Sequence, residues 1–232
     1  YFIRHSAGLG KSPTEKDPDI YDHRNIHCDV LVVGGGISGI LAAKNAAKNN
    51  LKTLLVDEKN ELGGATIYQN RELNRIDNQN SSDWVKKEIQ ELRNIKNLEI
   101  KTRTSVAAYH GYNYLLAREN LTDHLEKKDK LGKIRQRLLK IRAKKVILAT
   151  GALERPLIFN NNDRPGIMLS SAVKKYADFY GVVSGKKNVF FTNNDSAYET
   201  ALCLHNKGIK VEAVIDIRES SNSKIVKAVE NA

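Results

Sequence analysis

The residues of greatest chemical interest are the glycines of "GGGISG". Gly34, Gly36 and Gly39 follow the pattern G-x-G-x-x-G, directly after an apolar run and at the start of a helical pattern. This spacing permits a tight turn at Gly34, a bare backbone beside a pyrophosphate at Gly36, and close helix packing at Gly39. The first N–H groups of the helix, at Ile37 and Ser38, can donate to phosphate oxygens. The pattern therefore predicts a dinucleotide site.

An acidic pair follows where the second strand of such a unit ends. Asp57 lies 18 residues after Gly39, and Glu58 and Lys59 come next. A carboxylate at this point accepts hydrogen bonds from ribose hydroxyls. It also disfavours a 2′-phosphate, so an unphosphorylated dinucleotide such as NAD or FAD is expected rather than NADP.

Shorter signals accompany the glycine loop. "ELGG" places Gly63 and Gly64 soon after the acid, and "ATGA" ends a later apolar run with Thr150 and Gly151. In flavoprotein-type domains with two dinucleotide-binding folds, these elements surround the nucleotide, and the strand ending near Val106 passes the adenine. Each signal is weak alone, but in this order they support the same site.

Apolar and amphipathic segments predict the elements that hold these residues. Strands are expected at 29–33, 52–57, 98–106, 112–120, 134–143, 144–152, 188–191 and 210–218, and helices at 38–49, 82–96, 170–181 and 195–207. Ser82 is the expected N-cap of its helix. The fold class is α/β, a Rossmann-like FAD/NAD(P)-binding fold of the type with two dinucleotide-binding domains.

Three regions are expected along the chain. Residues 1–27 are polar and predict an extended arm. Residues 28–165 predict the first dinucleotide-binding domain with a β-hairpin insertion. Residues 166–232 predict a second, glycine-poor and truncated domain of the same kind. A start at Tyr1 and an end within a helical pattern suggest a piece of a longer protein.

The second domain contains a copy of the glycine loop without its glycines. A shift of 158 residues places Gly34 on Thr192, Gly36 on Asn194 and Gly39 on Ala197, within "TNNDSAYETA" (192–201). Ala can still fill the position where helix and strand pack, but a side chain at Asn194 would obstruct a pyrophosphate. We expect this loop to hold no dinucleotide in the usual pose. Its polar residues are expected to cap the helix or to bond another group.

Charge and cysteine content limit the other functions. The chain carries a net charge of +11, and residues 126–145 hold ten basic and two acidic residues. A nucleic-acid groove is disfavoured because no aromatic interleaving or known module accompanies this charge, which suits a solvated hairpin or a partner-facing surface. Cys28 and Cys203 lack metal spacing and are expected to be reduced, in a cytoplasmic protein. No metal site and no membrane span are expected.

Four blocks resemble the α subunit of heterotetrameric sarcosine oxidase. They are "HCDVLVVGGGISG", "LLVDEKNELGG", "RQRLLKIRAKKVILATGALERPLIFNNNDRPGIMLSSA" and "FTNNDSAYETAL". The resemblance covers nearly everything from Ser6 to Arg218, and its last two blocks are distinctive. The glycine-free loop is then a family trait.

The resemblance implies oxidative demethylation of sarcosine to glycine, with the one-carbon unit passed to tetrahydrofolate or released as formaldehyde, and with hydrogen peroxide as a product. It implies NAD in this segment, FAD and FMN in the complete complex, and β, γ and δ subunits as partners. The amine is oxidised in another subunit, so no catalytic residue is assigned here. The three loop glycines with Ile37 and Ser38 would contact pyrophosphate, Asp57 or Glu58 the ribose, and Val106 the adenine. Lys59, Gly63, Gly64, Thr150 and Gly151 would lie near the nucleotide.

Two alternatives remain open. FAD would occupy the first site in a related opine or amino-acid dehydrogenase subunit. In the other alternative the chain is a non-enzymatic assembly module with a vestigial site, and its basic hairpin docks partners.

Overall fold

The computed structural model describes residues 2–8, 14–68, 75–219 and 221–232, and its main feature is a six-stranded mixed sheet. The strand order is β5-β2-β1-β8-β7-β6, in which β5, β2, β1 and β8 are parallel to one another and β7 is antiparallel to both of its neighbours, β8 and β6. The sheet strands are β1 (Ile20–Val33), β2 (Thr53–Val56), β5 (Leu98–Lys101), β6 (Thr104–His110), β7 (Tyr114–Asn120) and β8 (Ile134–Leu148). This order is half of a doubly wound nucleotide-binding sheet with an antiparallel extension.

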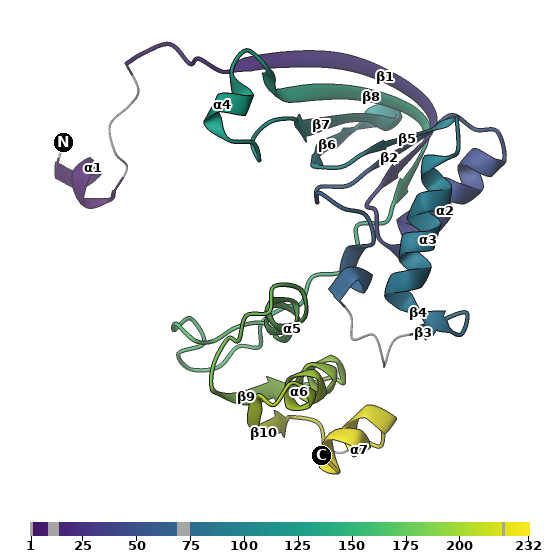
Figure 1. Cartoon of the computed structure of the whole chain (residues 1–232). Helices are drawn as coiled ribbons and strands as arrows, with labels where there is room; N and C mark the ends of the chain where they lie inside the picture. Colours follow the sequence, from purple (N-terminus) through teal and green to yellow (C-terminus); the bar gives the residue numbers. More distant parts are fainter. Residues whose placement is uncertain (1, 9–13, 69–74, 220) are drawn as a thin grey trace.

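Two helices cover one face of the parallel strands (Figure 1). They are α2 (Ile37–Lys48), which joins β1 to β2, and α3 (Ser81–Arg93). Their buried side chains pack on β1 and β2 in one cluster, which includes Val32, Ile40, Leu55, Trp84 and Leu92. The sequence forms α2 here because Ile40, Ala43 and Ala47 recur at helical spacing and are all buried.

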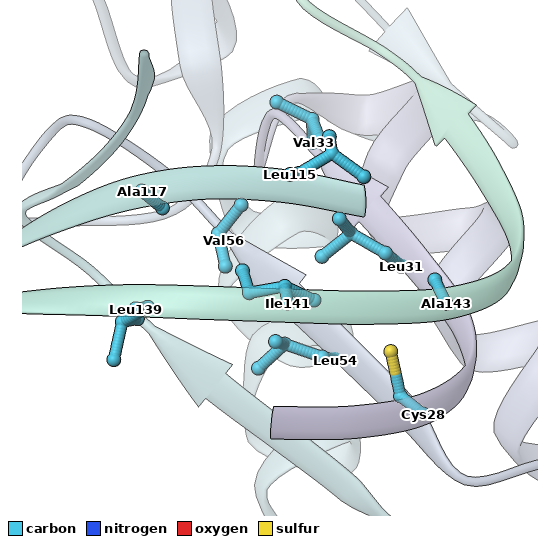
Figure 2. Packing of buried hydrophobic residues seen from close by; sticks show 10 residues of the cluster. All are labelled: Cys28, Leu31, Val33, Leu54, Val56, Leu115, Ala117, Leu139, Ile141 and Ala143. Atoms are coloured by element: carbon cyan, nitrogen blue, oxygen red, sulfur yellow. The ribbon is translucent and has the colours of Figure 1, made fainter. Parts of the chain in front are cut away.

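The opposite face is covered by the sheet itself. The sheet bends so that side chains of β1, β2, β7 and β8 pack together in one cluster, and Figure 2 shows the ten buried side chains of this cluster. Leu31, Leu115, Leu139 and Ile141 in this cluster have no exposed surface. The site-forming ends of β1 and β2 are therefore held between two apolar layers.

The predicted second βαβ unit is present. Strands β9 (Lys187–Thr192) and β10 (Lys210–Asp216) pair in parallel and are joined by α6 (Ser196–Asn206). Helices α5 (Ser170–Phe179) and α7 (Lys224–Glu230) flank them (Figure 1). Ala201 and Leu204 of α6 pack with Phe190 of β9 in a separate core. The domain boundaries proposed from the sequence remain predictions.

The remaining elements are short. They are α1 (Phe2–Ser6), η1 (Gly64–Tyr68), β3 (Arg75–Ile76), β4 (Gln79–Asn80), η2 (Gly111–Asn113) and α4 (Lys127–Lys130). In the part of the chain that the structure describes, no helix combines the length and apolarity that a membrane crossing needs.

The expected extended arm was wrong for residues 20–27. They form the first part of β1 and pair in parallel with β8 from Ile20 onward. Charge explains the pairing: Asp22 accepts from Arg137 at 2.8 Å, and Asp19 pairs with Arg135. The arm also includes α1, whereas Tyr1 and residues 9–13 lie outside the described residues. Part of the basic run is thus neutralised within the sheet.

Several boundaries also differ from the expected ones. The strands expected at 134–143 and 144–152 form one continuous strand, β8, which ends at Leu148. The strand expected at 98–106 is divided, because Arg103 adopts a φ of +50° that turns the chain between β5 and β6. Helix α5 ends at Phe179, before the expected residue 181.

The N-cap of α3 was also misplaced by sequence reasoning. The cap is Asn80, whose side-chain oxygen accepts from the backbone N–H of Ser82 at 3.0 Å. Ser82 itself lies inside the helix and was the wrong choice. Both residue types favour N-caps, so the sequence pattern does not fix the position.

Candidate dinucleotide-binding site

The first and last glycines of the G-x-G-x-x-G loop are required by packing. Gly34 has a φ of +104°, and a Cβ there would lie 2.3 Å from the carbonyl oxygen of Ala149. A Cβ on Gly39 would lie 1.8 Å from the oxygen of Gly34. Both positions are closed to larger residues because α2, the loop and the end of β8 are in direct contact.

The middle glycine is different, because the protein's own packing does not require it. Gly36 has a φ of −72°, which any residue can adopt. Apart from its chain neighbours, no described heavy atom would come nearer to its Cβ than Gly64 Cα, at 4.0 Å. The backbone here borders open space.

The start of α2 faces the same space. Gly36 is the N-cap residue of α2, and among the described residues no side chain caps this helix. The backbone N–H of Ile40 donates to Gly36 O at 2.9 Å, so the donors before it belong to the uncapped first turn. Ile37 and Ser38 therefore lie in the uncapped first turn of α2, where backbone N–H groups suit an anion, and their contact with a nucleotide stays a prediction.

The second glycine pair packs against this loop. Gly63 N donates to Gly35 O at 2.7 Å, and a Cβ on Gly64 would lie 2.9 Å from Gly36 Cα. Both Gly63 and Gly64 have positive φ. The structure therefore brings "ELGG" beside "GGGISG", and the Gly64 backbone forms part of the wall next to Gly36.

Asp57 holds the loop in place. Its side chain is buried, with one oxygen accepting from Gly35 N and the other from Lys59 N at 2.7 Å. Each carboxylate oxygen has a second lone pair, so these bonds leave acceptor capacity for a ribose hydroxyl. Glu58 is exposed and borders a cavity, so the two acids predicted as alternatives have different environments.

The remaining residues predicted for the site, Thr150, Gly151 and Val106, lie farther from the glycine loop or outside the cavity. Ala149 N donates to Val33 O at 2.7 Å, which places Thr150 and Gly151 just beyond the end of the sheet near Gly34. Gly151 has a φ of +76° and is exposed. Val106 lies in β6, where it packs against the apolar core, and it does not border the cavity described next.

A cavity of about 500 Å³ begins at Gly64 and Glu58 and extends between the two units. Its residues from the first unit include Glu58, Lys59, Glu61, Gly64, Ile67, Arg103, Asn120 and Asp123. Helix α5 supplies Lys175 and Phe179, and Tyr180 follows directly after the helix. Sequence reasoning identified only Glu58, Lys59 and Gly64 of this set, because pattern analysis gives no sign that α5 lies beside a loop more than one hundred residues earlier.

The second loop satisfies its own backbone. The side-chain oxygen of Asn194 accepts from the N–H of Ser196 at 3.0 Å and from its hydroxyl at 2.6 Å. Asn194 N in turn donates to Thr192 Oγ1 at 3.2 Å. Two roles are predicted for these polar residues, capping the helix or bonding another group. The N-cap residue, Asp195, forms no side-chain cap hydrogen bond with the described residues, and Asn194 instead accepts from the first helical N–H from the position before the cap.

Asp195 performs the other role. It accepts from the Arg218 guanidinium at 2.8 Å, and the same guanidinium donates to Asp216 at the end of β10 at 2.7 Å. Asp216 also accepts from the N–H of Arg218 at 3.0 Å, as Asp57 does from the N–H of Lys59. The Arg218 side chain thus lies between the helix start and the strand end, where a nucleotide would otherwise contact both.

Neither cysteine is suited to act as a nucleophile. Cys28 and Cys203 are buried and form no disulfide, and burial raises the pKa of each thiol to about 11. Across the described ranges, no group of three His, Cys, Asp or Glu side chains is placed to hold a metal ion.

The strand order and the glycine loop define a Rossmann-like FAD/NAD(P)-binding protein. Residues 29–144 match the FAD dependent oxidoreductase family, and the chain belongs to that family.

Among named proteins, the chain is similar to sarcosine oxidase subunit alpha. The protein from Corynebacterium sp. (strain P-1) is 41% identical over 222 residues, which is 96% of this chain and 23% of that protein. The one from Rhizobium meliloti (strain 1021) is 37% identical over 94% of this chain and 22% of its own length. The resemblance seen in the sequence is confirmed, and the chain spans less than a quarter of these relatives.

Solved structures agree on the fold. L-proline dehydrogenase from P. horikoshii superposes with a TM-score of 0.68 at 25% identity, covering 88% of this chain and 38% of that one. Thioredoxin reductase from Lactococcus lactis gives a TM-score of 0.59 at 22% identity, covering 87% and 60%.

Proposed function

We propose that this chain is the dinucleotide-binding segment of a multi-subunit amine oxidase, and that its first glycine loop binds NAD. Gly34, Gly36 and Gly39 with Ile37 and Ser38 would hold the pyrophosphate. Asp57 or Glu58 would accept from the ribose. Lys59, Gly63, Gly64, Val106, Thr150 and Gly151 complete the proposed set. A dinucleotide at this loop supplies redox chemistry or structural support, while the chain itself binds and orients it.

Gly36 carries this proposal. Glycine at Gly34 and Gly39 is explained by contacts within the protein, whereas glycine at Gly36 is not. Open space beside a bare backbone and an uncapped helix N-terminus suits a diphosphate, which needs close approach and N–H donors.

The proposed activity of the whole protein follows from the relatives. They are named sarcosine oxidase subunit alpha, so we propose oxidation at a CH–NH bond. In that reaction sarcosine loses its methyl group to give glycine, the one-carbon unit passes to tetrahydrofolate or is released as formaldehyde, and oxygen is reduced to hydrogen peroxide. A heterotetramer with β, γ and δ subunits, carrying FAD and FMN elsewhere and located in the cytoplasm, is the proposed assembly.

A second candidate is FAD in this same loop. The family match names FAD, and the glycine loop accepts the ADP half that NAD and FAD share. In that case this segment would bind FAD, as proposed for a related opine or amino-acid dehydrogenase subunit.

Mass spectrometry of released nucleotide separates these candidates. The full-length protein, purified with any subunits that remain attached, is denatured, and the supernatant is compared with that from a Gly36→Val variant. The nucleotide that disappears in the variant is the one held by this loop, because a side chain at this position would exclude a diphosphate, while its Cβ would come no closer than 4.0 Å to a described atom beyond the chain neighbours.

Loss of NAD from the variant supports the proposal, and loss of FAD supports the second candidate. Identical nucleotide content in both proteins would contradict both and favour an assembly module with a vestigial site.

A further inference from the structure

We infer that one face of strands β7 and β8 binds an acidic surface on another subunit of the assembly. This basic face consists of Tyr114, Leu116 and Arg118 of β7 with Leu138, Lys140 and Arg142 of β8. The inference rests on the proposed function, because it requires an assembly of several subunits.

Strand alternation creates the basic face. Leu115 and Ala117 of β7 and Leu139 and Ile141 of β8 point into the buried cluster of Figure 2 and have no exposed surface. Successive side chains of a strand point to opposite sides of a sheet. The six residues of the basic face alternate with these four, so they share the other side of the two strands. Each of the six is exposed or half-buried.

The cross-strand register brings cations and apolar side chains together. Three pairs make up the basic face: Tyr114 with Arg142, Leu116 with Lys140, and Arg118 with Leu138. The Arg142 guanidinium lies over the Tyr114 ring, 5.0 Å from its centroid. The face therefore combines half-buried apolar area with arginine and tyrosine, a composition that protein–protein interfaces favour.

The cations of the basic face are not used by the fold. Among the described residues, Arg118, Lys140 and Arg142 form no ion pair, and Arg142 donates one long hydrogen bond, of 3.4 Å, to Tyr112 O. Other cations of β8 are matched, since Arg135 and Arg137 each bridge two carboxylates. The basic run thus contains arginines that hold the sheet together and cations that remain available to a partner.

No carboxylate accompanies these cations on the flanking strands. The residues paired with the basic face are His23, Asn25 and His27 on β1 and Ser105, Ala108 and His110 on β6. Asp29, farther along β1, is already paired with Lys144 at 2.8 Å. A surface that covers three unmatched cations must supply negative charge, because like charges brought together are strongly unfavourable. The partner surface is therefore acidic.

An acidic protein fits the basic face better than a nucleic acid does. Single-stranded nucleic acid binds where bases can stack on open aromatic rings. The Tyr114 ring is covered by Arg142 on one side, and the His110 ring lies 5.9 Å from it, centroid to centroid. An arginine stacked on a ring keeps N–H groups at its edge for a carboxylate.

Zero-length cross-linking with a carbodiimide tests the inference on the full-length protein, purified with the subunits that remain attached. The reagent joins the Lys140 amine to a touching carboxylate as an amide and takes up the water that is lost. We expect mass spectrometry to find Lys140 joined to an Asp or Glu of another subunit. Lys140→Arg should keep the assembly and lose this cross-link, because a guanidinium keeps the charge without a reactive amine.

Charge reversal measures how much the basic face contributes. In Lys140→Glu combined with Arg142→Glu, we expect the attached subunit to bind at least roughly tenfold more weakly at about 0.1 M salt. Lys87→Glu combined with Arg93→Glu is the matched control, because it changes the net charge equally at two exposed positions of α3. It should leave the subunit bound. Sedimentation measures association, and thermal unfolding verifies that each variant is folded.

Three outcomes would overturn the inference. The first is a Lys140 cross-link to a carboxylate of its own polypeptide, and the second is equal association in the two double variants. The third is a single-stranded thymidine oligonucleotide that binds the unsubstituted protein but not the Lys140→Glu, Arg142→Glu variant, with the subunits still attached in both.

Nucleotide content, measured in the same preparations, separates this inference from the proposed function. Loss of dinucleotide in Gly36→Val together with any of these three outcomes would leave the nucleotide site standing and remove only the docking surface. Identical nucleotide content with and without Gly36→Val would contradict the proposed function whatever Lys140 is joined to. Full-length protein that retains no other subunit would overturn both the assembly and the inference.

Discussion

The two βαβ units share a backbone plan but satisfy their loops in opposite ways. In the first, Gly36 leaves the start of α2 uncapped beside open space. In the second, Asn194 accepts from the first N–H of α6, and Arg218 bridges Asp195 and Asp216. Both units keep the βαβ fold, so the fold alone does not identify a nucleotide loop. The comparison shows that the distinguishing feature is a helix N-terminus whose backbone N–H groups are left without protein partners among the described residues.

The comparison of the two units also shows that the three glycines of the G-x-G-x-x-G loop differ in how strictly the packing requires them. Ala197 occupies the position of Gly39 and is buried in the second core, so this helix accommodates a Cβ. In the first unit the same Cβ would contact Gly34 O at 1.8 Å. Helix α2 is therefore packed more closely on its loop than α6 is.

Replacement of the middle loop glycine by the residue at the matching position of the second loop should have the largest effect on dinucleotide binding. Gly36→Asn brings the second loop's side chain into the first, and we expect at least a hundredfold weaker dinucleotide binding, roughly 3 kcal/mol. The fold should be retained because a Cβ at this position meets no protein atom. Calorimetric titration and thermal unfolding measure the two effects.

The reciprocal change, Asn194→Gly, should not create binding, because Arg218 still bridges Asp195 and Asp216. Unchanged affinity in Gly36→Asn, or new binding in Asn194→Gly, would contradict the contrast between the loops.

Removal of the acid at the end of β2 should have the next largest effect. Asp57→Ala leaves the N–H groups of Gly35 and Lys59 without their acceptor, so it should weaken binding and stability by roughly 1–3 kcal/mol each. Glu58→Ala should leave stability unchanged because Glu58 is exposed. Equilibrium unfolding in urea and nucleotide titration distinguish the two residues. A binding loss confined to Glu58→Ala would assign the ribose contact to Glu58.

Loss of the Asn194 acceptor in the second unit should have a smaller and purely structural effect. Asn194→Ala removes the acceptor for Ser196, and we expect stability to fall by about 1 kcal/mol. Dinucleotide affinity should not change, since we expect this loop to hold no dinucleotide. A change in affinity measured alongside urea unfolding would show that the second loop contributes to the site.

The smallest expected effect is a pH dependence confined to the second unit. Hydrogen bonds from Arg218 lower the pKa of Asp216 from its ordinary value of 3.8 to about 2. Because the pKa is lower in the folded state, the stabilisation is complete above pH 4 and is lost as the pH falls from 4 toward 2. The partly exposed pair limits it to about 1 kcal/mol or less. Asp216→Asn should flatten the unfolding free energy over that interval, and an unaltered slope would exclude this pair as its source.

The sequence predicts the glycine loop and its altered copy well, because both depend on local spacing. Gly34, Gly39 and Gly64 lie where their pattern places them. It does not predict that Asn120 and α5 share a cavity, because that proximity comes from the packing of two units.

Long-range pairing also explains the missed arm. Residues 20–27 are polar and give no strand signal, yet they pair with β8, where Asp22 meets Arg137. The role of Asp57 depends similarly on Gly35, since only the folded loop shows that both carboxylate oxygens are engaged.

The long parallel ribbon of β1 and β8 has a consequence for the order of folding. Ile20 is paired with Ile134, so 114 residues separate strands that must meet before the sheet is complete. Contacts this distant along the chain form slowly, and on the ribosome β1 waits for its neighbour until β8 has emerged. Because Ala149, just after β8, touches Gly34, the nucleotide loop reaches its final shape only at that late moment.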